Sequence, residues 1–257
     1  MHLTPEQRAT FARDGFVVIP GVVDRARVDT ALQMVNNWIF SEYDHDKRVQ
    51  YYAQSFAPEL QADPHFLGLL TDTPVLALAT ELVGRPLPGG HERAQIALRF
   101  PVPPGGDPYY AGAHVDGVPT GINAVPADGH IHGFTVLAGI FLSDVTGPDQ
   151  GNFTVWPGSH LAMARWFAEH SPRIPDPEAF FRATEAVAAA TGAPYPITGR
   201  AGDLVLSHHL TAHANGGHAG PNIRYAVFFR LTSDARERLG DAVYTDPWAE
   251  WDAMRDA

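Results

Sequence analysis

The sequence predicts a mainly β protein with flanking helices, and a change of pattern at Arg93 is the main reason. Before that residue, apolar residues recur at helical spacing between capping signals. From Arg93 onward, short apolar segments are separated by turns rich in glycine and proline, which is typical of antiparallel strands. No internal repeat or low-complexity linker divides the 257 residues. We therefore expect one domain, in which helices of residues 1–90 pack on a β core of residues 91–232.

The expected helices begin and end at recognisable residues. Thr4-Pro5-Glu6-Gln7 has the pattern of a capping box with proline in the first turn, and Gly15 follows as a stop. Asp24 can cap a second helix, and Thr73-Pro74 opens a third that stops at Gly84. The segments "LAMARWFAEH" and "EAFFRATEAVAAAT" are expected to be helices inserted in the sheet region. The apolar face of the second helix consists of Val28, Leu32, Val35 and Ile39.

The expected strands are short. A brief strand, "FVVIP", separates the first two helices, and the other strands cover residues 93–100, 133–143, 152–156, 203–207 and 223–232. In "RAQIALRF", polar and apolar residues alternate, so that Arg93, Gln95 and Arg99 share one face. That face is either a solvated outer surface or the wall of a cavity that holds a polar ligand.

Charge and composition exclude several classes of protein. Asp and Glu outnumber Lys and Arg by 29 to 18, and the net charge of -11 disfavours binding to nucleic acid or anionic membrane surfaces. Because the chain has no cysteine, disulfides, iron–sulfur clusters and thiolate metal sites are excluded, and any metal has to bind His, Asp or Glu. The N-terminus lacks the basic start and apolar run of a signal peptide, and we expect a cytoplasmic protein.

Two segments far apart in the chain contain residues that could bind a metal together. In "AHVDG", His114 and Asp116 stand beside a glycine, but a hydrogen bond within a loop would explain this pair equally well. The later segment "GDLVLSHHLTAHANGGHAGPNIRYAVFFRL" consists of a turn, an apolar strand, several histidines, a turn-rich loop and a last strand with Arg224 near its start. Only a barrel that returns its last strands beside its first could bring the two segments together.

The residue types of these segments suit one kind of metal chemistry. Two histidines and one carboxylate on one face of a metal ion form the facial triad of non-haem Fe(II) oxygenases. Such a triad leaves three neighbouring coordination positions open. A 2-oxo acid can occupy two of them and dioxygen the third, while an arginine deeper in the cavity could bind the far carboxylate of 2-oxoglutarate.

Four segments together resemble the phytanoyl-CoA dioxygenase-like family of Fe(II)/2-oxoglutarate-dependent oxygenases, and the similarity extends over nearly the whole chain. They are "LTPEQRATFARDGFVVIPGVVD", "AHVDG", "LSDVTGPDQGNFTVWPGSH" and the late histidine and arginine segment. The resemblance implies a double-stranded β-helix, also called a jelly roll or cupin-like barrel, with helices packed outside it. It also implies Fe(II) and 2-oxoglutarate as cofactors.

The resemblance further implies roles for individual residues. His114, Asp116 and His213 match the three iron ligands. Arg224, which follows His213 at the spacing that the family pattern leads us to expect, matches the residue that binds 2-oxoglutarate.

Three other histidines of the late segment are alternatives. His208 and His209 are rivals of His213 as the distal ligand, but they precede the loop, and we assign them to the core or to the surroundings of the metal. His218 lies in a glycine-rich turn, where we expect a solvated side chain.

Some positions depart from the family pattern or extend it. Asn215 stands where many relatives have serine, and its amide could also donate to the oxoglutarate carboxylate. Gly139 or Ile140 stands where relatives often have a tryptophan near the cofactor, so the pocket would be lined differently. Gln95 is a further candidate contact for oxoglutarate or substrate.

The segment "GNFTVWPGSH" has a structural interpretation. Pro157-Gly158-Ser159 is expected to form a turn, with Ser159 or His160 capping the following helix. Trp156 either lines the cavity or packs in the core. His130 and His132, in the long loop after the metal ligands, are expected to be solvated.

The resemblance implies an enzyme that converts 2-oxoglutarate to succinate and CO2 while it oxidises a small organic metabolite, with hydroxylation as the first choice. Halogenation ranks lower, because related halogenases lack the carboxylate ligand that Asp116 provides here. Two alternatives stay open: a non-catalytic jelly-roll metal-binding protein, and a cupin-type metalloenzyme that does not use 2-oxoglutarate. Arg224 favours the oxygenase, since a buried cation aimed into the barrel needs an anionic partner.

The expected cavity wall indicates the kind of substrate. It comprises Tyr109, Tyr110, the loop 117–132, Phe153 and the C-terminal "VYTDPWAEW", which is an aromatic and moderately apolar set suited to a small or medium-sized metabolite. No basic cluster for the phosphates of coenzyme A is present in the sequence. We therefore expect a role in secondary metabolism, and the oligomeric state is left open.

Overall fold

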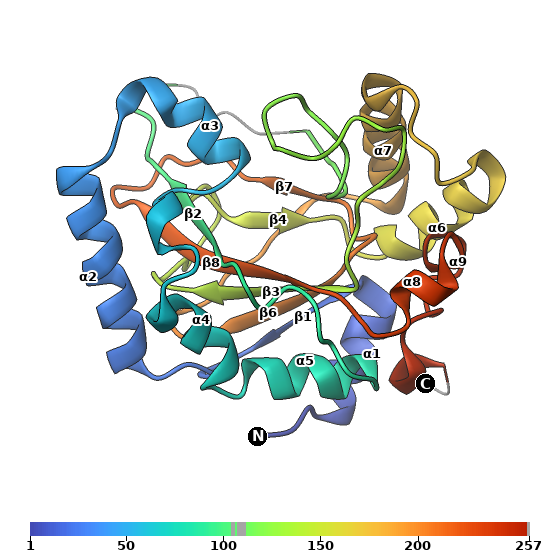
Figure 1. Cartoon of the computed structure of the whole chain (residues 1–257), viewed down its shortest axis with the longest axis horizontal. Helices are drawn as coiled ribbons and strands as arrows, with labels where there is room; N and C mark the ends of the chain where they lie inside the picture. The colour runs from blue at the N-terminus through green and yellow to red at the C-terminus, as the bar shows by residue number, and fades with distance from the viewer. Residues whose placement is uncertain (104–105, 107–111, 256–257) are drawn as a thin grey trace.

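Two antiparallel sheets form the centre of the molecule, and helices cover the outer face of the larger one (Figure 1). The computed structural model describes residues 1–103, 106 and 112–255. The larger sheet has the strand order β1-β6-β3-β8-β2, and the smaller has the order β5-β4-β7. The architecture is the mainly β jelly roll with flanking helices that the sequence predicted. The strands are β1 Phe16–Ile19, β2 Gln95–Arg99, β3 Val136–Phe141, β4 Phe153–Val155, β5 Tyr195–Pro196, β6 Leu204–His208, β7 His213–Asn215 and β8 Arg224–Leu231.

Both faces of the larger sheet are buried, and β3 shows why. Successive side chains of a strand point to opposite faces, so its continuous apolar run supplies two layers of the core. Its even-numbered residues pack with helices on the outer face. Leu137 and Phe141 pack with Phe153 and Phe228 in a second cluster that joins the two sheets. The outer helices are α1 Pro5–Asp14, α2 Arg25–Ser41, α4 Pro64–Thr71 and α5 Val75–Val83.

Helix α1 begins and ends as its sequence predicts. The Thr4 hydroxyl accepts a hydrogen bond from the Gln7 N–H, and the Gln7 side chain accepts one from the Thr4 N–H, which completes the capping box. Gly15 ends the helix with φ of 80°, and a Cβ there would lie 2.5 Å from the side chains of His160 and Thr211. Helix α2 begins after its predicted cap, Asp24, and α5 begins and ends close to its predicted residues.

The remaining helices are shorter or lie beside the smaller sheet. Those inserted in the sheet region are confirmed as α6 Ser159–His170 and α7 Pro177–Thr191, which pack against each other. Among the described residues, no single helix has the length and hydropathy needed to cross a bilayer, although α4 and α5 pass that test as a pair bent by 46°. The short helices are α3 Arg48–Ala53, α8 Arg236–Leu239 and α9 Ala242–Thr245, with 3-10 turns at His45–Lys47, Pro58–Leu60 and Asp252–Met254.

The expected strands are all present, with bounds close to those predicted. The structure also contains two strands, β5 and β7, and two helices, α3 and α4, that the sequence analysis did not predict. The pattern predicts a turn-rich loop after the late histidines, whereas His213–Asn215 form β7. Strands of two or three residues are too short to show an alternation of polar and apolar residues, so only their pairing with β4 identifies them.

The C-terminal segment 243–251 packs away from the expected cavity, so its predicted place at the substrate is wrong. Trp251 is fully buried, with its ring centroid 4.9 Å from that of Phe11 and 5.0 Å from that of His208. Val243 and Tyr244 join the cluster of α6 and α7. The aromatic residues of this segment therefore stabilise the fold around α1 and β6.

Three histidines form a buried group beneath this segment. The Nε2 atoms of His208 and His209 donate to the carbonyl oxygens of Pro247 and Val243, at 2.7 and 3.1 Å. The ring of His160 lies 5.3 Å from that of His208. Burial lowers the pKa of all three imidazoles, to about 4 for His160. The folded protein therefore holds them in the neutral form.

We expect the free energy of unfolding to fall as the pH drops below about 6.5. Histidines of the unfolded chain take up protons near that pH, whereas these three stay neutral in the folded state. Their contribution is fully present above the unfolded pKa and is lost toward the folded pKa, by up to about 1.4 kcal/mol per pH unit for each histidine. Urea unfolding between about pH 7.5 and 5 measures this slope.

The variant His209→Gln is the control for this prediction. Glutamine does not titrate but keeps an N–H that can donate to Val243, so the slope should become shallower. A slope identical to that of the wild type would contradict the assignment.

Candidate metal centre

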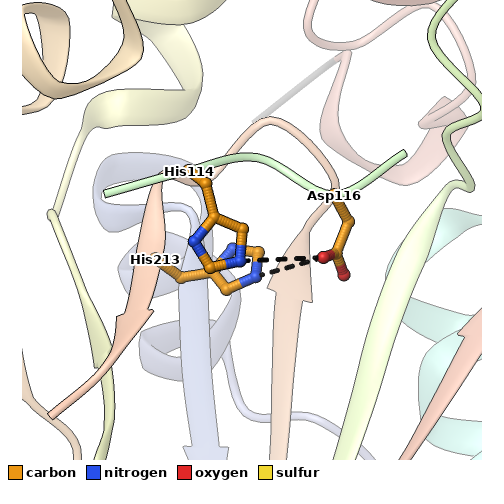
Figure 2. A group of neighbouring side chains, drawn as sticks. All are labelled: His114, Asp116 and His213. Carbon is orange, nitrogen blue, oxygen red and sulfur yellow. Dashed lines mark ion pairs between the residues drawn. The ribbon is translucent and has the colours of Figure 1, made fainter. Parts of the chain in front are cut away.

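His114, Asp116 and His213 lie together beside the smaller sheet (Figure 2). The backbone of His114 pairs with the start of β7: each of the two histidines donates its N–H to the carbonyl of the other, at 2.9 and 2.8 Å. This antiparallel pair sets the imidazole rings side by side, with centroids 4.5 Å apart. Asp116 Oδ1 lies 3.9 Å from His114 Nε2 and 3.6 Å from His213 Nε2.

A tight turn follows Asp116. Gly117 has φ of 91°, and a Cβ there would lie 2.5 Å from the carbonyl oxygen of His132. The His132 N–H donates to the Gly117 carbonyl at 2.8 Å. Only glycine fits both this conformation and this close approach, so the glycine of "AHVDG" fixes the direction in which the chain leaves the site.

Hydrogen bonds indicate which nitrogen of each imidazole is available. His114 Nδ1 lies 3.2 Å from the Gly112 carbonyl, and His213 Nδ1 lies 3.0 Å from the Thr211 carbonyl. An N–H at each Nδ1 satisfies these carbonyls. The Nε2 lone pairs then face Asp116, as metal ligation requires.

The charge states also suit a metal. Burial, together with the neighbouring His213, lowers the pKa of His114 to about 4. Burial acts to raise the pKa of Asp116, but Arg230 and His213 outweigh it and hold that pKa well below its usual range. Neutral imidazole and ionised carboxylate are the states that bind metal ions.

The three side chains fit divalent iron. One ligand atom from each lies within 4.8 Å of the other two, so a single ion can contact all three after small adjustments. Imidazole and carboxylate suit Fe(II), and a set of two histidines and one carboxylate leaves coordination positions open. The structure thus brings together the triad that the resemblance implied.

A cavity of about 600 Å³ adjoins the three ligands. Phe153 and several residues of the loop 117–132 line it, as the sequence predicted, while Tyr109 and Tyr110 lie outside the described residues. Tyr51, Tyr52, Leu137 and Phe228 make much of the remaining wall aromatic or apolar, and Gln95, Arg99, Arg230 and Glu185 add polar groups.

Arg224 lies deep on the inner side of β8 and is only 4% exposed. Its Nε donates to the Gly151 carbonyl at 2.8 Å and its Nη1 to the Ala97 carbonyl at 3.1 Å. Arg99 stands opposite it in the β2–β8 register and stacks on Tyr52, with 4.6 Å between the guanidinium carbon and the ring centroid.

Both guanidinium groups remain cations at neutral pH. Burial and the neighbouring Arg99 lower the pKa of Arg224 to about 9, and burial lowers that of Arg99 to about 10. Within the described residues neither forms an ion pair with a carboxylate. Arg224 is buried, whereas Arg99 is half-buried and lines the cavity. Two adjacent cations of this kind are suited to an anionic ligand.

Gln95 and Asn215 both line the cavity but differ in their contacts. Gln95 Nε2 donates to the Gln54 carbonyl at 2.9 Å, and its Oε1 accepts from Arg230 at 2.8 Å, so both ends of the amide are used within the protein. Asn215 ends β7 and also lines a second cavity of about 480 Å³. Trp156 lines that second cavity and not the one beside the metal ligands.

Three late histidines lie outside the metal site. His208 and His209, the rival ligands, belong to the buried group beneath the C-terminal segment. The expectation of a solvated His218 is wrong, because its side chain is buried near Arg224, and burial lowers its pKa.

The turn before α6 is present, but its predicted cap is wrong. Ser159 Oγ accepts from the Ala212 N–H at 2.9 Å, so it ties α6 to the strand that carries His213. His160 is buried and does not cap the helix either. His130 and His132 are exposed, as expected.

Gly139 and Ile140 have different environments. Ile140 packs in the outer core, whereas Gly139 faces the inner side, where a Cβ would lie 2.5 Å from the ring of Phe228. The inner wall at this point of β3 is therefore filled by Phe228.

Of the two faces left open for the polar side of β2, the cavity wall is the one observed for Gln95 and Arg99. Arg230 is a cavity residue that the sequence analysis did not assign to the site. It shares a strand face with Arg224 on β8, so the period of two along that strand is the signal that could have found it.

Comparisons with known proteins agree with the fold. The epimerase SnoN from nogalamycin biosynthesis is 22% identical and has a TM-score of 0.62, with 89% of this chain and 80% of that chain covered. HygX from Streptomyces hygroscopicus, with nickel and 2-oxoglutarate bound, is 22% identical with a TM-score of 0.59 and coverages of 91% and 88%. EctD from S. alaskensis with bound Fe is 19% identical with a TM-score of 0.57 and coverages of 90% and 77%. No curated protein matches the chain.

Fold and ligand set define a class, that of the Fe(II)/2-oxoglutarate-dependent oxygenases. Within this class, the model of the family "Phytanoyl-CoA dioxygenase (PhyH)" matches residues 11–226. The chain therefore belongs to the phytanoyl-CoA dioxygenase family and is an oxidoreductase that uses Fe(II) and 2-oxoglutarate.

Removal of the distal histidine should abolish tight metal binding. We expect His213→Ala to weaken the affinity for Ni(II), an inert substitute for Fe(II), by roughly 100-fold or more, because only two ligands remain. Titration calorimetry measures the affinity. His209→Gln should bind Ni(II) like the wild type, and retained Ni(II) affinity in His213→Ala would refute the site.

Proposed function

We propose that the chain hydroxylates a small organic metabolite at a C–H bond held beside the three metal ligands, with release of succinate and CO2. The observation that carries this proposal is the placement of His114, Asp116 and His213 on the wall of a cavity of about 600 Å³. The ligands occupy one side of the cavity, which leaves the rest of it for co-substrate and substrate.

Arg224 and Arg99 are the proposed partners of the far carboxylate of 2-oxoglutarate. They are neighbours across the β2–β8 pair on the strand face that Gln95 and Arg230 share, and both retain their charge at neutral pH. Each hydrogen bond to a charged group contributes about 1.5–3 kcal/mol. Asn215 is proposed to add an amide donor, whereas Gln95 is reassigned to Arg230, which uses its oxygen.

When bound, Fe(II) would activate dioxygen, which is the oxidant, and 2-oxoglutarate would supply two of the four electrons that dioxygen takes up, so that one oxygen atom enters succinate and the other the substrate. The chain supplies orientation and shielding. Phe153 packs against His213, with ring centroids 5.2 Å apart, and Phe228 packs against Phe153 at 5.4 Å. These rings exclude water from the inner side of the ligands, so that the oxidising chemistry is directed at the bound substrate.

The cavity supports a metabolite of small or medium size as the substrate. Its walls are largely aromatic and apolar. Of the two arginines in the described wall, Arg230 pairs with Asp116 and Arg99 is proposed to bind 2-oxoglutarate. A site for the phosphates of coenzyme A is therefore not part of the proposal. SnoN was crystallised with nogalamycin RO and HygX with hygromycin B, which supports a role in secondary metabolism.

The alternatives to hydroxylation are other reactions of Fe(II)/2-oxoglutarate-dependent enzymes and other classes of metal-binding protein. One structural neighbour is an epimerase and another, SnoK, is a carbocyclase, so epimerisation and ring closure are the alternatives to hydroxylation. Asp116 supplies the carboxylate of the proposed ligand set, which disfavours halogenation. A non-catalytic metal-binding protein, or a cupin-type enzyme without 2-oxoglutarate, would have no use for two adjacent guanidinium groups without carboxylate partners, one of them buried. The cytoplasmic location and the absence of nucleic-acid or membrane partners stay predictions.

Loss of Arg224 should weaken the binding of 2-oxoglutarate. We expect Arg224→Met to raise the dissociation constant by about 10- to 100-fold, which corresponds to the loss of one or two charged hydrogen bonds. Anaerobic titration of the Fe(II) protein, followed by the visible charge-transfer band of the chelate, measures it. Arg182→Met, on the exposed side of α7, is the matched control. Unchanged affinity in Arg224→Met would refute the cofactor assignment.

Turnover should require both the ligands and a suitable substrate. We expect succinate release above the uncoupled background with at least one compound of a natural-product panel, and less than about 1% of that rate in His114→Ala. Mass spectrometry of the product distinguishes a gain of one oxygen from epimerisation or ring closure. An active His114→Ala variant would contradict the proposed site.

A further inference from the structure

The two carboxylate oxygens of Asp116 have different partners. Oδ1 faces the two imidazoles, at 3.9 Å from His114 Nε2 and 3.6 Å from His213 Nε2. Oδ2 accepts a hydrogen bond from Arg230 Nε at 3.0 Å and lies 2.9 Å from Arg230 Nη2. One oxygen is thus directed to the metal position and the other is held by a cation.

Arg230 is itself held in place. It lies on the same face of β8 as Arg224, and its guanidinium carbon is 5.8 Å from the centroid of the Phe134 ring. Its Nη1 donates to Gln95 Oε1 at 2.8 Å, and Gln95 Nε2 donates in turn to the Gln54 carbonyl at 2.9 Å. A chain of hydrogen bonds therefore runs from the backbone beside α3 to the metal ligand.

We propose that Arg230 is a positioning residue that restricts Asp116 to one-oxygen coordination of the metal. The role rests on the proposed function, because it concerns the coordination positions that 2-oxoglutarate and dioxygen need. This role also explains why β2 begins with a polar residue, because Gln95 accepts a hydrogen bond from Arg230 and so orients the guanidinium.

The physical argument concerns competition for a coordination position. A carboxylate with two free oxygens can bind a metal ion with one or with both of them. Charge-assisted hydrogen bonds from a guanidinium are among the stronger ones in proteins. Oδ2 accepts one from Arg230 Nε, and Arg230 Nη2 adds an ion-pair contact at 2.9 Å. With Oδ2 engaged, Asp116 takes one position only. Without Arg230, its second oxygen could take a position that the keto acid requires.

The opposite possibility is that Arg230 binds an acidic group of the substrate. Its side chain is 37% exposed and lines the cavity, so a substrate anion could reach it. Such an anion would compete with Asp116 for the same guanidinium. Only the positioning role affects metal coordination before any substrate is present, so experiments without substrate distinguish the two roles.

The test uses Co(II) as a spectroscopic probe in the full-length protein, with 2-oxoglutarate and no substrate. We expect Arg230→Met to bind Co(II) within about threefold of the wild type but to bind 2-oxoglutarate about 10-fold more weakly, with a changed visible d–d spectrum. Arg230→Lys should recover part of the affinity, and Gln95→Leu should show a smaller loss. Arg182→Met should match the wild type. Unchanged 2-oxoglutarate affinity and spectrum in Arg230→Met would overturn the proposal.

A crystal structure of the Ni(II)-loaded wild type decides the matter even if Arg230→Met does not fold. We expect Oδ1 of Asp116 on the metal and Oδ2 on Arg230, and coordination by both oxygens would overturn the proposal. If the wild type binds Co(II) but not 2-oxoglutarate, the proposed function fails, while the Ni(II) structure still shows whether Arg230 sets the coordination of Asp116.

Discussion

Two backbone hydrogen bonds between His114 and His213 are the constraint on which the whole site depends. They join segments far apart in the chain and place both imidazoles on the same side of the smaller sheet. A shift of this pair by one residue would turn one imidazole to the opposite face. The register is secured by β7 itself, because Val155 of β4 pairs with His213 and the Ser159 side chain binds the backbone of Ala212. Packing of β4 in the inner core thus determines the geometry of the ligands.

The interior of the jelly roll carries more charge than its apolar walls would suggest. Arg224 is stabilised by two carbonyl oxygens, but carbonyls do not neutralise its charge or that of Arg99. Burial of unpaired charge is costly. In the proposed enzyme a dicarboxylate supplies the missing negative charge, so co-substrate binding and fold stability are linked. Asp116 and Arg230 show the other solution, in which the protein provides both partners.

Much of the fold follows from local pattern, because the strands with alternating or continuous apolar residues have bounds close to those predicted. The three residues that the structure brings together as a candidate metal site were also predicted from sequence, through the resemblance carried by "AHVDG" and the late histidine segment. Other features depend on tertiary contacts. His218 stands in a glycine-rich turn that looks solvated until the chain folds over it, and aromatic residues such as Trp251 can serve a cavity or a core equally well. The pairing of Arg230 with Asp116 depends on the register of β8, which no local pattern encodes. That the chain forms one domain stays a prediction.

Strand β5 has a consequence for how copies of the protein meet in solution. It consists of Tyr195 and Pro196 only and forms the outer border of the smaller sheet. A long border with free N–H and C=O groups would offer a template for another chain. Proline has no N–H, and two residues give too little length for a stable ladder. This side of the molecule is therefore protected from growing into a continuous intermolecular sheet, which favours dispersal over fibre formation at high concentration.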